Sequence, residues 1–248
     1  MSTPLASDDP TQDKVRPVAS TLSTIILLLI VAALAYAGYL HAGHLRATAQ
    51  HSHVLEYAVT LAEEWLLFLF VVISMRRAST PLRDVIGGQW KSPKNMLIDI
   101  IIAALFWAFS AGVLAALQFA MAISAKERLA QVGFLVPRGW GELALWCALS
   151  LTAGFCEETV FRGYFQRQFT AFTKSAMAGI VLQGLVFGAA HLYQGFKTPI
   201  VIAVYGILFG LLAHFRRSLR PGMIAHAWQD TITGVALSFM AKYGKYQF

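Results

Sequence analysis

The sequence predicts an all-α membrane protein, a polytopic bundle of seven or eight transmembrane helices. Of its 248 residues, 57% are hydrophobic and only 13% are charged, whereas roughly 25% of an average soluble domain is charged. The apolar residues also gather in runs close to the roughly 20 residues that cross the hydrocarbon core of a bilayer. A soluble domain of this length does not need so much apolar sequence, so a single membrane bundle is the better interpretation.

Seven apolar runs follow a polar, proline-containing tail. Pro199 and Pro221 stand where the last two of these runs begin, and proline is well tolerated at the start of a helix. Pairs of glycines four residues apart, Gly184 with Gly188 and Gly206 with Gly210, permit close contact between helices. The predicted spans are Leu22–Leu40, Val54–Met75, Met96–Ser124, Gly141–Phe161, Ser175–Tyr193, Pro199–Phe215 and Gly222–Ala241.

The first run has a second interpretation, a secretory signal sequence. Lys14 and Arg16 precede it, and residues 33–35 (Ala-Leu-Ala) resemble a cleavage site. Its apolar character continues to Leu40, however, and further spans follow. A retained transmembrane helix is therefore favoured.

The net charge of +7 is carried mainly by short linkers between apolar runs. In a soluble protein this charge would suggest a nucleic-acid partner, but here most lysines and arginines lie on the side of the N-terminal tail. The pairs Arg76–Arg77 and Arg216–Arg217 are the clearest examples. Because cytoplasmic loops carry an excess of Lys and Arg, we expect a multi-pass protein of the inner (plasma) membrane with a cytoplasmic N-terminus. Its expected partner is the lipid bilayer, and we expect no nucleic-acid partner.

Three ionisable residues interrupt the fourth apolar run. Residues 157–162 read Glu-Glu-Thr-Val-Phe-Arg, and residues 141–156 before them carry a single charge, Glu142. Each charge inside a bilayer costs on the order of 2.5–3.5 kcal/mol, so such residues usually mark a functional site. Positions i and i+4 share a helix face, which pairs Glu158 with Arg162 and leaves Glu157 free. The alternative is that all three side chains only hold helices together.

A second acid pair, Glu63–Glu64, also lies beside an apolar run. Its i+4 partner is Phe68 instead of a base, and the pair falls near the start of its run. We therefore interpret these two carboxylates as interfacial or structural.

Two later apolar runs each contain a histidine four residues from a second notable side chain. Phe187 shares a helix face with His191, and His226 shares one with Asp230, within expected hydrogen-bonding reach. A lone intramembrane histidine is usually a bonded core residue. Two of them after a pair of acids favour a converging site, because a carboxylate base, histidines and a polar partner are the ingredients of acid–base catalysis.

Taken together, these three motifs resemble a known family. E-E-x-x-x-R at 157–162, F-x-x-x-H at 187–191 and H-x-x-x-N/D at 226–230 are similar to the motifs of the CAAX-protease and bacteriocin-processing (CPBP, or ABI) family. This family of intramembrane endopeptidases includes the Ras-converting CAAX protease. The resemblance covers about residues 95–241 and implies an intramembrane active-site cavity there. Together with the composition of the rest of the chain, it predicts four regions. These are a disordered tail (1–18), N-terminal spans with a cytoplasmic linker (19–94), a CAAX-protease-like domain (95–241) and a C-terminal tail (242–248).

The resemblance also implies catalytic roles. Glu157 would be the general base that activates water, assisted by His191, and His226 with position 230 would stabilise the tetrahedral oxyanion. Eukaryotic relatives have asparagine where this chain has Asp230, and an ionised aspartate cannot donate a hydrogen bond. Asp230 would then orient a protonated His226 or be protonated itself. The residues with implied supporting roles are Glu158, Arg162 and Phe187.

Several alternatives stay open. No cofactor is expected, but Glu157, His191, His226 and Asp230 are also credible zinc ligands for a site that keeps one position for water, although no H-E-x-x-H occurs. A non-catalytic immunity or scaffold protein is another possibility. The expected substrate is a peptide or protein, including membrane-anchored ones. A prenylated substrate does not follow, because this short, alanine-rich chain is typical of bacteria.

Overall fold

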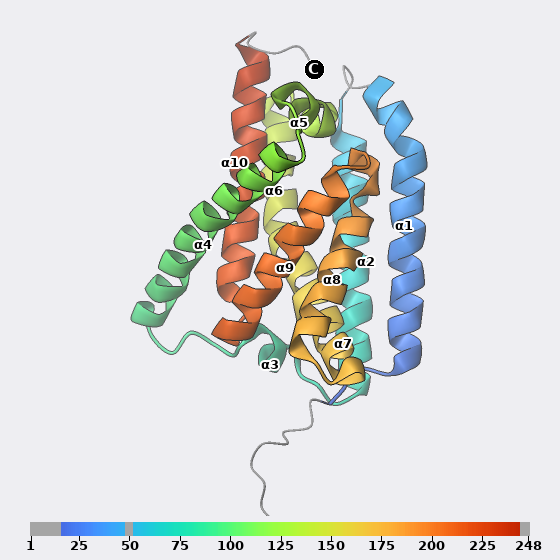
Figure 1. Ribbon diagram of the computed structural model, residues 1–248, viewed down its shortest axis with the longest axis vertical. Helices are drawn as coiled ribbons and strands as arrows, with labels where there is room; N and C mark the ends of the chain where they lie inside the picture. Colours follow the sequence, from blue (N-terminus) through green and yellow to red (C-terminus); the bar gives the residue numbers. More distant parts are fainter. Residues whose placement is uncertain (1–15, 48–51, 244–248) are drawn as a thin grey trace, which may run out of the picture.

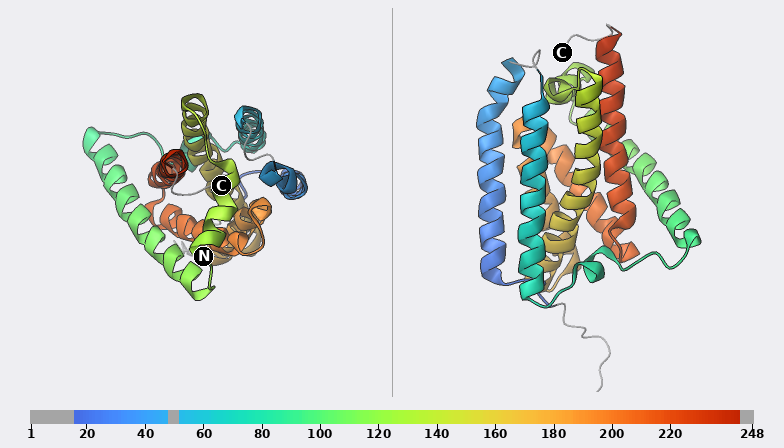
Figure 2. Two further views of the ribbon diagram at one scale, coloured as in Figure 1. Left: turned by 90° about the horizontal axis from the view of Figure 1, so that it is seen from above. Right: turned by 180° about the vertical axis from the view of Figure 1, so that it is seen from behind.

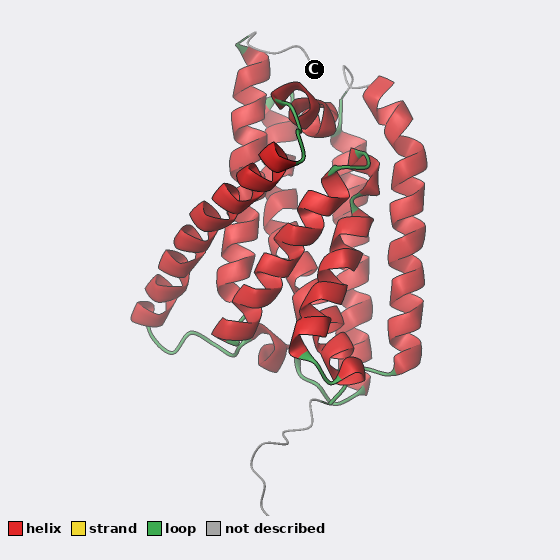
Figure 3. Ribbon diagram, viewed as in Figure 1, coloured by secondary structure: helices red, strands yellow, loops and turns green. Residues whose placement is uncertain are grey.

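The computed structural model describes residues 16–47 and 52–243, and these residues form helices joined by loops (Figure 3). The predicted all-α class is confirmed for this part of the chain. Each predicted span overlaps one helix of 15 residues or more (Figure 1). These helices are α1 (Thr21–Ala47), α2 (Val54–Arg77), α4 (Pro93–Ala120), α6 (Trp140–Glu157), α8 (Ala176–Ala190), α9 (Thr198–Arg216) and α10 (Arg220–Lys242).

Shorter elements complete the chain. A π-helix, η2 (Glu158–Phe165), follows α6 directly and continues into α7 (Gln166–Thr173), so Trp140–Thr173 is one helical segment of 34 residues. The other short elements are α3 (Leu82–Ile86), α5 (Ala125–Val132) and the two 3₁₀ turns η1 (Gly133–Leu135) and η3 (Leu192–Gln194).

Five helical segments among the described residues are long and apolar enough to cross a membrane, which makes this a multi-pass membrane protein. They are α1, α2, α4, the segment Trp140–Thr173, and α9. Apolar α8 has only 15 residues, fewer than the roughly 20 that span the hydrocarbon core. Length and composition therefore support fewer spans than the seven or eight predicted.

The helices run up and down between two ends of the bundle. At the lower end in Figure 1, α1 begins and α2 ends; α5 and η3 lie at the upper end. α2 and α6 run side by side in the same direction, because Tyr57 packs on Trp146 (ring centroids 5.6 Å apart) and Phe68 packs on Phe155 (5.1 Å). Both views in Figure 2 show α4 leaning away from the other helices.

A buried carboxylate fastens the lower part of α4. Asp99 is fully buried and forms ion pairs with Arg216 (Nη2–Oδ1, 2.7 Å) and Arg220 (Nε–Oδ2, 3.1 Å). Trp90 Nε1 also donates to Asp99 Oδ2 at 2.8 Å. These contacts join α4 to the end of α9 and the start of α10, although only 11% of the most apolar part of α4 is buried. The rest of that helix is suited to lipid.

The start of α1 is held by one buried side chain of α7. Gln168 Oε1 accepts hydrogen bonds from the amides of Val18 (2.6 Å) and Ala19 (3.1 Å), and Gln168 Nε2 donates to Thr24 Oγ1 (2.7 Å). Val18, which the sequence analysis assigned to the disordered tail, is therefore buried and ordered. The rest of that tail up to residue 15, and residues 244–248 of the predicted C-terminal tail, lie outside the described residues.

Helices α8 and α9 approach each other through their glycines. A Cβ added at Gly206 would lie 3.0 Å from the Cα of Gly184. Next to this contact, Gln183 Nε2 donates to the backbone oxygen of Gly206 at 2.8 Å. The predicted close approach at the G-x-x-x-G pairs is thus observed, and it brings α9 against the helix that carries Phe187.

Gly184→Ala should destabilise the protein, because the new Cβ would lie 2.6 Å from Ile207 Cγ1 and 2.9 Å from the Ala203 backbone oxygen. Overpacking of this kind typically costs about 1–3 kcal/mol. Gly112→Ala on α4 is the matched control, since its Cβ would meet nothing within 4 Å. Denaturant unfolding in detergent measures both free energies; equal stability of the two variants would contradict the packing argument.

Candidate active site

The first site motif lies where α6 passes into the π-helix. Glu157 ends α6, and both Glu158 and Arg162 belong to η2; π-helices occur frequently at functional sites. Arg162 Nη1 lies 2.9 Å from Glu158 Oε1, and both side chains are fully buried. The predicted i,i+4 pair is therefore present, while the Glu157 side chain retains 16% exposure.

Arg162 is enclosed by aromatic rings and one carbonyl. Its Cζ lies 4.3 Å from the ring centroid of Phe187 and 4.9 Å from that of Phe209. Its Nη2 donates to the Gly206 backbone oxygen at 3.4 Å. A buried cation needs such compensation because its lost hydration is expensive, and aromatic faces supply part of it. Sequence reasoning found Phe187 but missed Phe209 and Gly206, which come from α9.

His226 joins the carboxylates of the site. Its Nδ1 lies 3.0 Å from Glu158 Oε1, at hydrogen-bonding distance. Its Nε2 lies 3.7 Å from Glu157 Oε2 and 3.6 Å from Asp230 Oδ2. These two distances suit ion pairs but exceed those of hydrogen bonds. The expected hydrogen bond between His226 and Asp230 is therefore not formed, and the hydrogen-bonding partner of His226 is Glu158.

Two glycines allow α10 to approach the acids. A Cβ on Gly222 would lie 3.1 Å from Glu158 Oε2, and a Cβ on Gly154 would lie 2.7 Å from the backbone oxygen of Met223. Without side chains at these positions, α10 packs closely against α6 and η2. That packing brings His226, four residues after Gly222, to Glu158.

His191 is held beside this cluster at the end of α8. Its Nδ1 lies 2.9 Å from the Phe187 backbone oxygen, so the protonated nitrogen donates to that carbonyl. Its ring packs edge-on against Phe187 (4.9 Å) and stacks on Tyr193 (5.9 Å). Within the described residues, His191 forms no hydrogen bond or ion pair with Glu157. The two side chains are close enough only to interact electrostatically. His191 is thus a predicted site residue without a hydrogen bond or ion pair to either Glu157 or Glu158 within the described residues.

Glu64, from α2, is a site residue that sequence reasoning missed. Its carboxyl lies within hydrogen-bonding reach of the Glu157 carboxyl. The packing of Trp65 and Phe68 on Phe155, with ring centroids 6.3 and 5.1 Å apart, places this part of α2 alongside the end of α6. The acid pair 63–64 was visible in the sequence, but its interfacial or structural interpretation did not anticipate this contact.

Among the residues that the structure describes, no three His, Cys, Asp or Glu side chains are placed to hold one metal ion. Two cavities lie elsewhere, at the lower end of the bundle, one between α1 and α2 and one beside Asp99. The predicted active-site cavity is neither of these, since Glu157 lines neither.

The fold and the site define a multi-pass membrane protein with a buried acid–histidine cluster, which consists of Glu157, Glu158, His226 and Asp230. Comparison with protein families agrees: residues 139–232 match the family described as type II CAAX prenyl endopeptidase Rce1-like. The chain therefore contains a domain of this endopeptidase family, which lies within the predicted region 95–241. Membership implies an intramembrane endopeptidase that acts on peptide substrates. No curated protein and no solved structure matches the chain.

Arg162→Met should be strongly destabilising, because it leaves Glu158 buried without its guanidinium partner. Breaking a buried ion pair by removing one side typically costs about 3–5 kcal/mol. The double variant Glu158→Gln/Arg162→Met should recover part of this loss, since the uncompensated charge is gone. Unfolding in detergent measures both; a single variant within about 1 kcal/mol of the wild type would show that the pair contributes little.

Proposed function

We propose that the chain hydrolyses peptide bonds within the membrane, with Glu157 as the general base that activates water. The supporting observation is the difference between the two adjacent acids. Glu158 is fully buried and is bound by Arg162 and His226. Glu157 keeps 16% side-chain exposure, and its ion-pair contact with His226 Nε2 is longer, at 3.7 Å. One carboxylate is neutralised by its partners, and the other is free to accept a proton.

In the proposed reaction, Glu157 takes a proton from water as the oxygen attacks the peptide carbonyl. The tetrahedral intermediate that forms carries the negative charge on the former carbonyl oxygen. Glu157 then returns the proton to the amide nitrogen, the C–N bond breaks, and a carboxylic acid and an amine leave. No covalent intermediate with the enzyme is needed.

His226 is suited to stabilise the oxyanion. Its Nδ1 is engaged by Glu158 at 3.0 Å, which fixes the orientation of the ring. Its Nε2 has no acceptor at hydrogen-bond distance in the two carboxylates beside it, at 3.6 and 3.7 Å. In the protonated imidazolium this N–H is available to the developing oxyanion. Asp230 acts by orienting and neutralising the imidazolium, the first of the two roles expected for it.

His191 assists Glu157 through the water molecule. Its Nδ1 faces the Phe187 carbonyl, so in the neutral ring Nε2 is the nitrogen that accepts a hydrogen bond. Phe187 supports both histidines and Arg162 through its ring. Its role is to position these groups.

Glu64 shares a proton with Glu157. Two carboxyl groups within hydrogen-bonding reach cannot both be ionised at low cost, so one proton lies between them. We propose that Glu64 holds that proton and donates a hydrogen bond to the ionised Glu157. This contact would orient the base and makes α2 part of the active site, outside the matched residues 139–232.

The proposed topology has seven membrane crossings, with α8 and α10 added to the five apolar segments, around an active-site cavity. The basic pairs Arg76–Arg77 and Arg216–Arg217 lie at the ends of α2 and α9, at the same end of the bundle (Figure 1). By the positive-inside rule this end is cytoplasmic, with the N-terminus on the same side of the inner membrane.

Glu157→Gln should abolish cleavage, with a loss of at least about a thousandfold, because the amide cannot take the proton from water. His226→Ala should lower kcat by about 10²–10³ through loss of the oxyanion donor. Purified protein incubated with a peptide library measures both, with cleavage sites read by mass spectrometry. Glu63→Gln is the matched control, since it removes a neighbouring acid outside the site and should leave the rate unchanged.

The same assay separates the alternatives. Cleavage that survives Glu157→Gln would eliminate this glutamate as the base. Activity lost on chelation and restored by zinc would support the hypothesis of a zinc-dependent protease. The proposed mechanism predicts that the chelator has no effect. If the wild type cleaves no peptide, a non-catalytic immunity or scaffold role becomes the better explanation.

Variants of Glu64 test the shared proton. Glu64→Gln should keep activity within about threefold of the wild type, because the amide N–H still donates to Glu157. Glu64→Leu, which removes the donor, should lower kcat by about tenfold or more with little change in KM. Glu63→Leu controls for an apolar side chain next to the site. Equal activity of the glutamine and leucine variants would contradict the proposed contact.

A further inference from the structure

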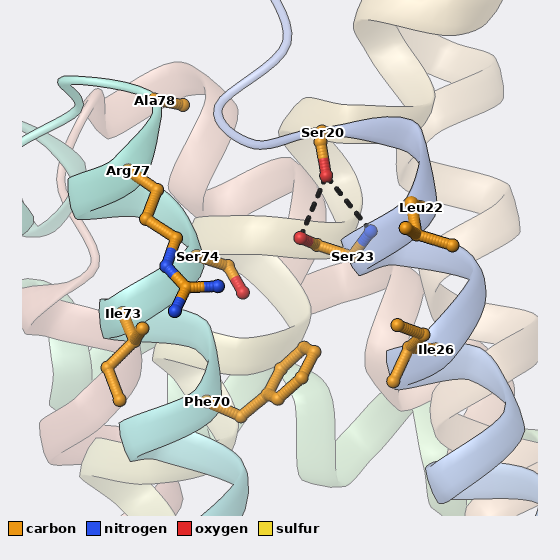
Figure 4. A pocket seen from close by; sticks show the side chains of 9 residues that line it. All are labelled: Ser20, Leu22, Ser23, Ile26, Phe70, Ile73, Ser74, Arg77 and Ala78. Atoms are coloured by element: carbon orange, nitrogen blue, oxygen red, sulfur yellow. Dashed lines mark hydrogen bonds between the residues drawn. The ribbon is translucent and has the colours of Figure 1, made fainter.

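A cavity of about 480 Å³ lies between the first turns of α1 and the last turns of α2, at the lower end of the bundle (Figure 4). It lies away from the acid–histidine cluster, and neither the family match nor the proposed mechanism assigns it a role. Its lining residues are Ser20, Leu22, Ser23, Ile26, Phe70, Ile73, Ser74, Arg77 and Ala78. The lining divides into a polar part and an apolar part.

The polar part offers hydrogen-bond donors and one positive charge. Arg77 has no ion pair or hydrogen bond within the described residues, and Figure 4 shows its guanidinium directed toward the hydroxyl of Ser74. Ser74 is 6% exposed and its hydroxyl likewise has no partner there. Ser74 lines the cavity, so a group bound there would supply the hydrogen-bond partner that buried polar residues generally have. Both side chains therefore lack a partner on the same side of the cavity.

The opposite wall is the N-terminus of α1. The Ser20 and Ser23 hydroxyls are 2.9 Å apart and share one hydrogen bond, which leaves the proton of the accepting hydroxyl free for another partner. At the start of this 27-residue helix, the Ser23 N–H already donates to Ser20 Oγ (3.1 Å) and the Thr24 N–H to the Ser20 carbonyl (3.2 Å); the helix dipole still favours a negative charge at this end. None of the lining residues is acidic. The cavity thus combines one positive charge with hydroxyl donors and has no negative side chain in its lining, which suits an anion.

The apolar part consists of exposed side chains on α1 and α2. Leu22, Ile26 and Ile73 are 66%, 38% and 49% exposed, and they belong to two of the helices long and apolar enough to span a membrane. An inorganic anion would make no favourable contact with these apolar side chains. A molecule with a negative headgroup and hydrocarbon chains contacts both parts at once.

The cavity is also framed by fixed backbone. Gln168 of α7 binds the amides of Val18 and Ala19, directly before the start of α1. The Tyr164 hydroxyl lies 3.2 Å from Thr24 Oγ1 and holds the next turn. The serines of α1 are therefore presented by a segment that is already ordered, which lowers the entropic cost of binding.

We propose that this cavity binds the phosphate headgroup of an anionic phospholipid. Arg77 would pair with the phosphate, Ser74 and the α1 serines would donate to its oxygens, and the acyl chains would lie along Leu22, Ile26 and Ile73. The phosphate would join the start of α1 to the end of α2. The proposal does not depend on the catalytic mechanism, since Glu157 takes no part in it.

The test measures lipid binding to the purified full chain in detergent by native mass spectrometry, with phosphatidylglycerol as the probe. Phosphatidylcholine supplies the same chains without net charge, and sodium phosphate supplies the anion without chains. Arg77→Gln should weaken phosphatidylglycerol binding by about tenfold or more, because a charge-assisted contact is lost, and Ser74→Ala should weaken it several-fold. Arg76→Gln is the matched control: it removes the neighbouring charge from the same helix end but does not line the cavity.

Equal weakening by Arg76→Gln and Arg77→Gln would overturn the proposal, because charge at the membrane surface would then explain the binding. Phosphatidylcholine binding as tight as phosphatidylglycerol binding would overturn the anionic specificity. Sodium phosphate that displaces the lipid completely at equal concentration would reduce the site to a simple anion site. If Arg77→Gln fails to fold, Arg77→Lys and Ser74→Ala carry the test, with wild-type-like and weakened binding expected respectively.

Discussion

The buried ion pair between Glu158 and Arg162 is the constraint on which the rest of the site depends. Two charges removed from water are tolerated only if neighbouring groups compensate them, and here the compensation comes from three other helices. Phe187 and Phe209 cover the guanidinium, the Gly206 carbonyl accepts from it, and His226 bonds to the same carboxylate oxygen. α8, α9 and α10 must therefore converge on η2, and glycines at the contacts make that convergence sterically possible.

This arrangement divides the work between two adjacent acids. Because Glu158 is committed to the ion pair and to His226 Nδ1, Glu157 remains partly exposed, and the set of groups around it includes His226 Nε2 at 3.7 Å. The contact with Glu64 extends that set to α2, beyond the residues that match the endopeptidase family. The N-terminal helices of this chain are thus more than a membrane anchor for the domain, since one of them meets the candidate base directly.

The bilayer shapes the remainder of the molecule. α4 leans away from the bundle with little of its apolar surface buried, and it is held at one end by the charges around Asp99. The cavity between α1 and α2 lies at that same end. Charged and polar groups concentrate where helices end, and apolar side chains face outward between them, as expected when lipid is the solvent. Lipid headgroups at this end would meet both fixed charges and fixed donors.

The amino-acid sequence by itself determined what is local along a helix. The apolar runs predicted seven of the observed helices, and spacing of four residues predicted the pairing of Glu158 with Arg162 and the proximity of Phe187 to His191, because such pairs need only helical geometry. Contacts between helices were decided by the tertiary structure. His226 binds Glu158 instead of Asp230, Phe209 and Gly206 complete the surroundings of Arg162, and Glu64 meets Glu157. Such contacts depend on the direction and depth at which separate helices cross, and residue spacing within one helix carries no information about either.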